Sequence, residues 1–290
     1  KLRMFEQELP DVSIYVKCEQ LNPGGSMKDR PVRHMLLDML AEGKLEPGKT
    51  ILDSSSGNAG IALAAIGGLI GYPVELCVPA NASVERKKRI LAHGARIIET
   101  DPMLGYDAAP QLARKRVKEG ADKYILPDQY GNPQNWRSHY DTTAVEMIEQ
   151  VPEEITHCVL GIGTGGSVTG IGRRLKEHNK NIEMVLMEID DFTGIEGLKC
   201  IGPGNFVPEI FDESVVDRRI DITTPAALKM CHRLAAQGFF VGQSSGAYID
   251  TAYRLAKTIK QGCIVTMFCD IGERYFSTGL WDEVPKNISV

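Results

Sequence analysis

Short runs of apolar and β-branched residues alternate along the chain with longer segments whose apolar positions repeat at helical spacing. The short runs are SIYVKCE, TILDSSS, VELCVP, RIIET, KYILP, HCVLGIG, EMVLMEI and CIVTMFCD. The longer segments include IALAAIGGLIG, SVERKKRILAHG, YDAAPQLARKRVKEG, DTTAVEMIEQV and ALKMCHRLAAQG, several of which end in a helix-closing glycine. This alternation predicts an α/β fold with mainly parallel sheets covered by helices on both faces.

The chain of 290 residues is long enough for one large core or for two linked lobes. Its longest irregular stretch runs from about residue 190 to 214, and loops of that length are often functional. In parallel sheets, ligands bind at the carboxyl ends of strands, where loops meet the N-termini of helices. The loops that follow strands are therefore the candidate binding segments.

Three such loops are rich in glycine and serine, and each is expected to follow a strand and open a helix: DSSSGNAG (53–60), GIGTGGSVTG (161–170) and GQSSGA (242–247). Backbone N–H groups at a helix N-terminus attract anions. The second loop best suits a phosphate, because small side chains leave its backbone open and two hydroxyls add donors, in Gly163, Thr164, Gly165, Gly166 and Ser167. The first loop offers hydroxyls and an amide that suit a small carboxylate.

Each loop also has an alternative explanation. Gly161, Gly163 and Gly166 fit G-x-G-x-x-G after a strand, and Glu188 follows 22 residues after Gly166, which together form a dinucleotide-binding pattern. The second loop could equally be a tight turn between a strand and a helix. In the first loop, Ser56 or Asn58 could simply cap the following helix, and the serines of the third loop have the same alternative.

Lys28, in NPGGSMKDR, lies where helix electrostatics disfavour an ammonium ion. Ser26 resembles an N-cap and Pro31 fits a first turn, so a helix is expected to start near Met27. The partial positive charge of that turn would lower the pKa of the lysine and leave a nucleophilic amine. The alternative is a solvated surface lysine that leans toward Asp29.

Taken together, the three loops and the lysine indicate a site for a phosphate, a carboxylate and an electrophilic carbonyl. Pyridoxal phosphate carries the phosphate and the aldehyde, and an amino-acid substrate brings the carboxylate. Over nearly its whole length the chain resembles the fold-type-II pyridoxal-phosphate enzymes of the cysteine synthase (O-acetylserine sulfhydrylase) and cystathionine β-synthase family. The four motifs that carry the resemblance occur in the family's order: NPGGSMKDR, SSGNAG, GTGGSVTG and GQSSGA.

The resemblance implies a tryptophan synthase β-like fold of two three-layer α/β/α domains. The smaller, substrate-loop domain is expected at residues 22–133, and the larger, phosphate-binding domain at 1–21 and 134–290. Lys28 would form the Schiff base with the cofactor and act as the acid–base group at the substrate α-carbon. The implied cofactor contacts are Lys28, Asn58 at the 3-hydroxyl, Gly163, Thr164, Gly165, Gly166 and Ser167 at the phosphate, and Ser244 at the pyridine nitrogen. The implied substrate contacts are Ser55, Ser56, Gly57, Ala59 and Gln129.

The implied reaction is β-replacement on an activated serine, O-acetylserine or O-phosphoserine, through an aminoacrylate intermediate, with sulfide as the nucleophile and L-cysteine as the product. Cystathionine β-synthase activity is the main alternative, followed by serine or threonine dehydration, a NAD-dependent dehydrogenase and a non-enzymatic binding module. The family implies a homodimer, with serine acetyltransferase or a sulfur-carrier protein as candidate partners.

Two departures from the family pattern affect the expected site. Ala59 replaces the usual threonine and removes one hydroxyl from the carboxylate loop, although its backbone N–H remains. The stretch GIEGLKCIGPGNFVP is longer than the usual loop and contains Lys199. A cation near the mouth of the active site suggests an anionic leaving group such as phosphate.

Composition indicates which partners, which cellular location and which metal content to expect. Residues are 43% hydrophobic and 24% charged, with a net charge of −5 and no long basic run, which argues against nucleic-acid binding. Seven cysteines without C-x-x-C spacing indicate reduced thiols, and we expect a cytoplasmic protein that has no membrane-spanning segment. Six histidines without ligand spacing predict no metal site.

Overall fold

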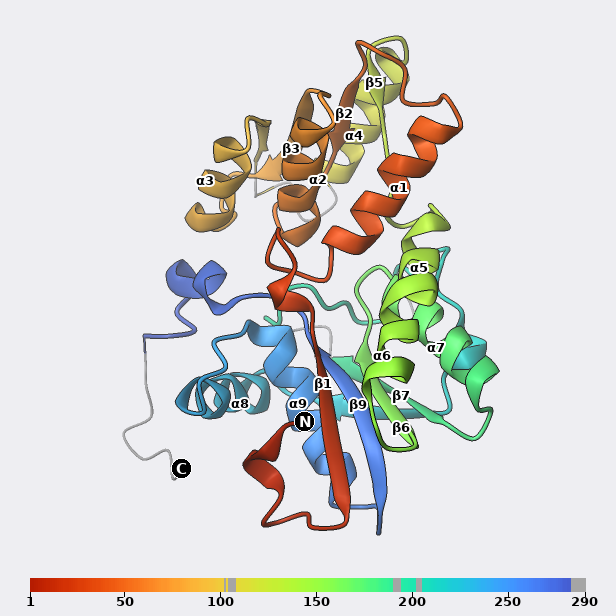
Figure 1. The fold of residues 1–290 in the computed structure, drawn as a ribbon. Coiled ribbons are helices and arrows are strands. Elements are labelled where there is room, and N and C mark those ends of the chain that lie inside the picture. The colour runs from red at the N-terminus through yellow and green to blue at the C-terminus, as the bar shows by residue number, and fades with distance from the viewer. Residues whose placement is uncertain (102, 104–107, 190–193, 202–204, 283–290) are drawn as a thin grey trace.

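The computed structural model contains two parallel β-sheets that are covered by helices (Figure 1). It describes residues 1–101, 103, 108–189, 194–201 and 205–282. The larger sheet has the strand order β1-β9-β6-β7-β8, and the smaller sheet has the order β4-β3-β2-β5. Every strand pair in the two sheets is parallel, which confirms the predicted α/β class.

The larger sheet is the lower half of the molecule in Figure 1. Its strands are β1 (Val12–Cys18), β6 (His157–Gly161), β7 (Glu183–Ile189), β8 (Arg218–Ile222) and β9 (Gly262–Phe268). Its helices are α5 (Gln134–Ser138), α6 (Ala144–Gln150), α7 (Gly166–His178), α8 (Thr224–Ala236) and α9 (Gln243–Ala256). Alternate residues of β6 face opposite cores: Cys158 and Leu160 pack in the core of α6 and α7, and Val159 packs in that of α8 and α9.

The smaller sheet lies above it in Figure 1 and is likewise packed between helices on its two faces. Its strands are β2 (Thr50–Asp53), β3 (Val74–Pro79), β4 (Arg96–Thr100) and β5 (Tyr124–Ile125). Its helices are α1 (Asp29–Ala41), α2 (Asn58–Leu69), α3 (Val84–Ala92) and α4 (Ala108–Glu119). Ile51 packs in the core formed with α1 and α2, and Leu52 packs with α4 on the other face. Each sheet is therefore the middle layer of three.

Short helical turns complete the described structure: η1 (Arg3–Phe5), η2 (Glu19–Leu21), the π-helical η4 (His139–Thr143), η5 (Glu213–Val215) and η6 (Gly272–Thr278). Residues 194–201 and 205–212 form neither helix nor strand, whereas the rest of the predicted loop, 190–193 and 202–204, lies outside the described residues. The domain division at residues 22 and 133 stays a prediction.

Three local predictions were wrong. Helix α1 starts at Asp29, so Lys28 is its N-cap residue and does not lie in the first turn. The loop 242–247 does not follow a strand, since Val241 forms only an isolated bridge with Ile271. Strand β8 was missed because its sequence, RRIDI, is polar and largely exposed at the edge of the sheet, without the apolar run used to predict strands.

Candidate active site

Lys28 lies where the two sheets meet, at the start of α1. Its backbone N–H donates to Ser26 Oγ at 3.2 Å, and the preceding N–H of Met27 donates to Cys269 O, at the end of β9, at 2.8 Å. The residue as a whole is half-buried, but its amine lies in a dehydrated environment. Burial lowers the pKa of Lys28 to about 8, and the nearby Cys269 raises it in part. Desolvation is thus the main cause, instead of the helix dipole expected from the sequence.

The residues predicted to hold a phosphate form a glycine-dependent turn between β6 and α7. Gly165 has φ +84°, a conformation that other residues rarely adopt. A Cβ at Gly163 would lie 2.5 Å from Gly197 O, and one at Gly166 would lie 2.1 Å from Asn135 Oδ1. The backbone is therefore packed so closely that side chains are excluded. The first N–H groups of α7 have no acceptor within the helix and suit an anion.

The substrate-loop residues lie at the N-terminus of α2, where Asn58 and Ala59 are the first helical residues. Ser55 Oγ accepts a hydrogen bond from Gly57 N at 3.4 Å. Ser56 lies in the same loop and is half-buried, whereas Ala59 is buried. The loop thus presents serine hydroxyls and helix-start N–H groups together, as expected for a carboxylate site.

Gln129 is buried, and a residue that sequence reasoning missed connects it to the phosphate loop. Asn135 Nδ2 donates to Gln129 O at 2.6 Å and to Thr164 Oγ1 at 3.1 Å. Asn135 therefore brings together the segments predicted to bind the substrate carboxylate and the phosphate.

Ser244 lies in the first turn of α9, and the thiol of Cys269 interacts with both Ser244 and Lys28. Burial raises the pKa of Cys269 to about 12, while the Ser244 hydrogen bond and the Lys28 charge lower it in part. Cys269 is therefore a neutral thiol that contacts the predicted pyridine-nitrogen residue and faces the predicted Schiff-base lysine. The sequence indicated only a buried cysteine here.

Asn58 has two partners that were also missed, Asp270 and Arg274. Its Nδ2 donates to Asp270 Oδ2 at 2.8 Å, and Arg274 Nη1 donates to its Oδ1. No local pattern marks these contacts, because the partners lie 212 and 216 residues away along the chain.

Two surface cavities can be compared with the positions of the predicted site residues. One of about 480 Å³ opens between the end of β8 and helices α8 and α9, and it contains none of the predicted site residues. A narrow one of about 20 Å³ reaches Gln129 beside the buried Asp53. The chemistry of the side chains therefore locates the candidate site better than cavity size does.

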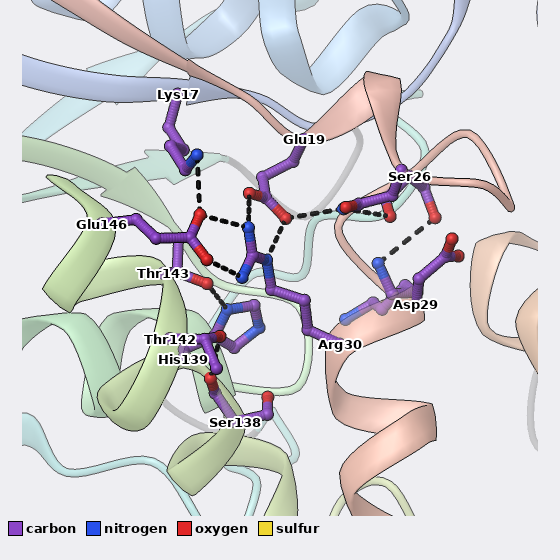
Figure 2. A network of polar contacts seen from close by, with 12 residues as sticks. Lys17, Glu19, Ser26, Asp29, Arg30, Ser138, His139, Thr142, Thr143 and Glu146 are labelled. Carbon is purple, nitrogen blue, oxygen red and sulfur yellow. Dashed lines mark hydrogen bonds and ion pairs between the residues drawn. The ribbon is translucent and has the colours of Figure 1, made fainter. Parts of the chain in front are cut away.

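A charged network lies beside the site and holds the start of α1 (Figure 2). The Arg30 guanidinium lies between two carboxylates: it contacts Glu19 at 2.7 and 2.8 Å and Glu146 through two bonds of 2.7 Å. Lys17 adds a contact to Glu146 at 2.8 Å. Glu19 is only 1% exposed, and Arg30 is the cation that pairs with its buried carboxylate. Because Arg30 is two residues after Lys28, this network fixes the position of the lysine backbone.

His139 belongs to the same region and packs inside it. It is fully buried, and its Nδ1 lies 2.9 Å from Thr143 Oγ1 (Figure 2). Burial, followed by the charges of Lys28 and Arg30, holds the pKa of His139 well below its usual value. The imidazole is therefore neutral and adds no charge next to Lys28.

Comparison with known proteins identifies the family. A family model described as pyridoxal-phosphate dependent enzyme matches residues 1–270. The chain belongs to this family. The cysteine synthase of Aquifex aeolicus is 47% identical over 288 residues, which cover 97% of this chain and 88% of that protein.

Solved structures of similar proteins agree with the fold. The structure titled cysteine synthase (OASS) from Entamoeba histolytica has a TM-score of 0.89 and 34% identity, and the match covers 97% of this chain and 85% of that one. O-ureido-L-serine synthase gives the same score and identity and covers 97% and 91%. These findings confirm the predicted fold, the cofactor and the cysteine synthase class of this pyridoxal-phosphate enzyme.

The side chains present suit this cofactor. Lys28 provides an amine that is easily deprotonated, and the N–H groups that open α7 after the glycine turn suit a phosphate. No group of three or more His, Cys, Asp or Glu that could hold a metal occurs in the described part of the chain. Nor is any helix within the described ranges long and apolar enough to cross a membrane.

We predict that Arg30→Met lowers the free energy of unfolding by about 3 kcal/mol, because it leaves the buried Glu19 carboxylate without its cation. Glu146→Gln is the comparison variant at the half-buried end of the network, where Gln keeps hydrogen-bonding atoms, and its loss should be smaller. Urea unfolding measures both, and equal losses would contradict the central role of Glu19.

The network also predicts an acid-dependent loss of stability. Hydrogen bonds from Arg30, together with the Lys17 contact, lower the pKa of Glu146 from 4.5 to about 2. A depressed folded-state pKa stabilises the protein above the unfolded value, so this contribution should be lost as the pH falls from about 4.5 toward 2. Glu146→Gln should lack this part of the pH dependence when unfolding is followed across that range.

Proposed function

We propose that the protein catalyses β-replacement on an activated serine with sulfide to give L-cysteine. The observation that carries the proposal is the Lys28 amine, which burial makes available as a base near neutral pH close to Cys269, the thiol that contacts Ser244. The cysteine synthase relatives support the same reaction.

In this proposal Lys28 Nζ holds the cofactor and moves the proton at the substrate α-carbon. Pyridoxal phosphate supplies an electron sink at that carbon when it is bound. Lys28 takes the α-proton, and the leaving group departs from the β-carbon with its bonding electron pair. Sulfide then forms the new C–S bond, and Lys28 returns a proton to the α-carbon.

The loops would orient the reactants. Gly163, Thr164, Gly165, Gly166 and Ser167 would hold the cofactor phosphate, and Asn58 would donate to its 3-oxygen. The substrate carboxylate would bind Ser55, Ser56, Gly57, Ala59 and Gln129, where Ala59 contributes only its backbone N–H. Ser244 would meet the pyridine nitrogen with a neutral hydroxyl. Unlike a carboxylate, a hydroxyl does not hold the nitrogen protonated, so the ring is a weaker electron sink and elimination is favoured over transamination.

As further proposals, the family resemblance supports a homodimer, a cytoplasmic location and serine acetyltransferase or a sulfur-carrier protein as partner. These do not affect the chemistry at Lys28.

The function is tested by supplying the purified, cofactor-loaded protein with O-acetylserine, O-phosphoserine or serine and with sulfide or homocysteine. Cysteine formation from sulfide is expected, and Lys28→Ala should lower its rate by at least about 100-fold because the proton-transfer group is removed. Lys44→Ala, at an exposed lysine of similar type, is the control and should keep the wild-type rate. Cystathionine formed with homocysteine but no cysteine formed with sulfide would replace the proposal by its main alternative.

The leaving group follows from the position of Lys199. Its backbone N–H donates at 2.8 Å to the carbonyl of Ile162, next to the phosphate loop. Its ammonium lies 4.3 Å from the centre of the Tyr130 ring, and Tyr130 follows Gln129. The backbone of Lys199 is thus held next to the predicted phosphate loop and its ammonium lies at Tyr130, beside Gln129; we propose that this cation favours O-phosphoserine by attracting the phosphate leaving group.

Lys199→Ala should accordingly lower kcat/KM for O-phosphoserine by about tenfold, the loss of one charge-assisted hydrogen bond, and change the value for O-acetylserine by less than about twofold. Lys180→Ala, at an exposed lysine beyond α7, is the matched control. An unchanged preference between the two substrates in Lys199→Ala would contradict the proposed role.

A further inference from the structure

The amide of Asn58 is held at both ends by one buried turn after β9. Nδ2 donates to Asp270 Oδ2 at 2.8 Å, and Oδ1 accepts from Arg274 Nη1. Asp270 is 0% and Arg274 3% exposed, so both contacts are shielded from water. Burial lowers the pKa of Arg274 from its ordinary value and the Asp270 carboxylate raises it in part, which places the two charges near each other.

The chemistry of these partners fixes the orientation of the amide. An ionised carboxylate only accepts hydrogen bonds, and a guanidinium only donates them. The Asn58 atom that faces Asp270 must therefore be the NH₂ group, and the atom that faces Arg274 must be the oxygen. A rotated amide would be repelled at both ends. Since Asp270 uses one N–H, the second N–H of Nδ2 is the group that Asn58 can present to a ligand.

The same turn also holds the Lys28 segment. Arg274 Nη2 donates to Gly24 O, and Cys269 O accepts from Met27 N at 2.8 Å. The turn after β9 therefore sets both the orientation of Asn58 and the position of Lys28.

The Ser244 loop also contacts the turn after β9. Gly242 N donates to Asp270 O at 3.1 Å, and a Cβ at Gly242 would lie 2.2 Å from Asp270 Oδ1. Tyr275 donates its hydroxyl to Asp270 Oδ2 at 2.8 Å. Burial raises the pKa of Tyr275 well above its usual value, so the hydroxyl stays neutral and keeps its proton to donate.

We propose that Asp270 and Arg274 are positioning residues that orient Asn58 Nδ2 as a hydrogen-bond donor to the 3-oxygen of pyridoxal phosphate. The inference rests on the proposed function, in which Asn58 meets that oxygen. A fixed N–H donor stabilises the ionised form of the oxygen relative to the protonated form. The two residues act on the cofactor through Asn58 and do not themselves contact it.

The test uses purified protein and pyridoxal phosphate without substrate. Arg274→Met removes the donor that holds Oδ1, and the cofactor Kd should rise about tenfold. The absorbance should shift toward the form with a protonated 3-oxygen, and the pH at which the two forms interchange should rise by about one unit. Arg274→Lys, which keeps one donor, should recover part of both changes.

A second variant tests the inference if Arg274→Met does not fold. Asp270→Asn replaces an obligate acceptor by a group that also donates, so it no longer excludes the rotated Asn58 amide, and it should shift the absorbance in the same direction. Tyr275→Phe is the matched control: it removes a buried hydrogen bond to Asp270 without releasing Asn58, so it should lower the urea midpoint and leave the absorbance unchanged.

Three results would overturn the inference. The first is that both Arg274→Met and Asp270→Asn keep a cofactor Kd within about twofold, and an interchange pH within about 0.2 unit, of wild type. The second is an equal absorbance shift in Tyr275→Phe, and the third is a full additional shift when Arg274→Met is combined with Asn58→Ala. If wild-type protein shows no cofactor absorbance, or Lys28→Ala leaves that absorbance unchanged, the proposed function fails together with the inference. A normal wild-type spectrum with unchanged variants overturns the inference alone.

Discussion

Two charged side chains buried in the turn after β9, Asp270 and Arg274, impose a constraint on the whole site. Removing such charges from water costs several kcal/mol per ion unless their polar atoms find partners. Asp270 Oδ2 and the two Nη atoms of Arg274 find partners, whereas Asp270 Oδ1 and Arg274 Nε have none among the described residues. Tyr275 belongs to the same turn, and the other two partners, Asn58 and Gly24, belong to segments far away in the chain. The requirement to satisfy buried charges therefore also assembles the loops that bind ligand, which links the stability of the fold to the geometry of the site.

Lys28 and Arg30 show how neighbouring cations acquire different roles. Burial lowers the pKa of Arg30, but the hydrogen bonds that Arg30 donates to Glu146 and Glu19 outweigh it and raise the pKa overall, so the guanidinium stays charged. For Lys28 burial is the dominant influence, and its pKa falls to about 8. His139, kept neutral by burial, adds no further charge. The same helix start thus holds a structural cation and, two residues away, an amine that can exchange protons near neutral pH.

The sequence predicted the features that local patterns encode. The apolar run HCVLG at β6 and the glycine turn before α7 follow from alternation and backbone freedom, and so does the helix-opening position of Asn58. The polar edge strand β8 was missed because edge strands need no apolar run. Asn135, Cys269, Asp270 and Arg274 were missed for another reason: their roles come from tertiary contacts, and no spacing rule connects Asn58 with a residue 212 positions later. The cause of the Lys28 pKa shift was misjudged because desolvation depends on packing, which a sequence does not display.

The central claim is that Lys28 is the amine that carries the cofactor. Borohydride reduction of the cofactor-loaded protein, followed by proteolysis and mass spectrometry, tests it directly because reduction makes the lysine linkage permanent. We expect one pyridoxyl-modified peptide, with the modification on Lys28. Modification of another lysine, such as Lys17 or Lys199, or no modified peptide at all, would contradict it.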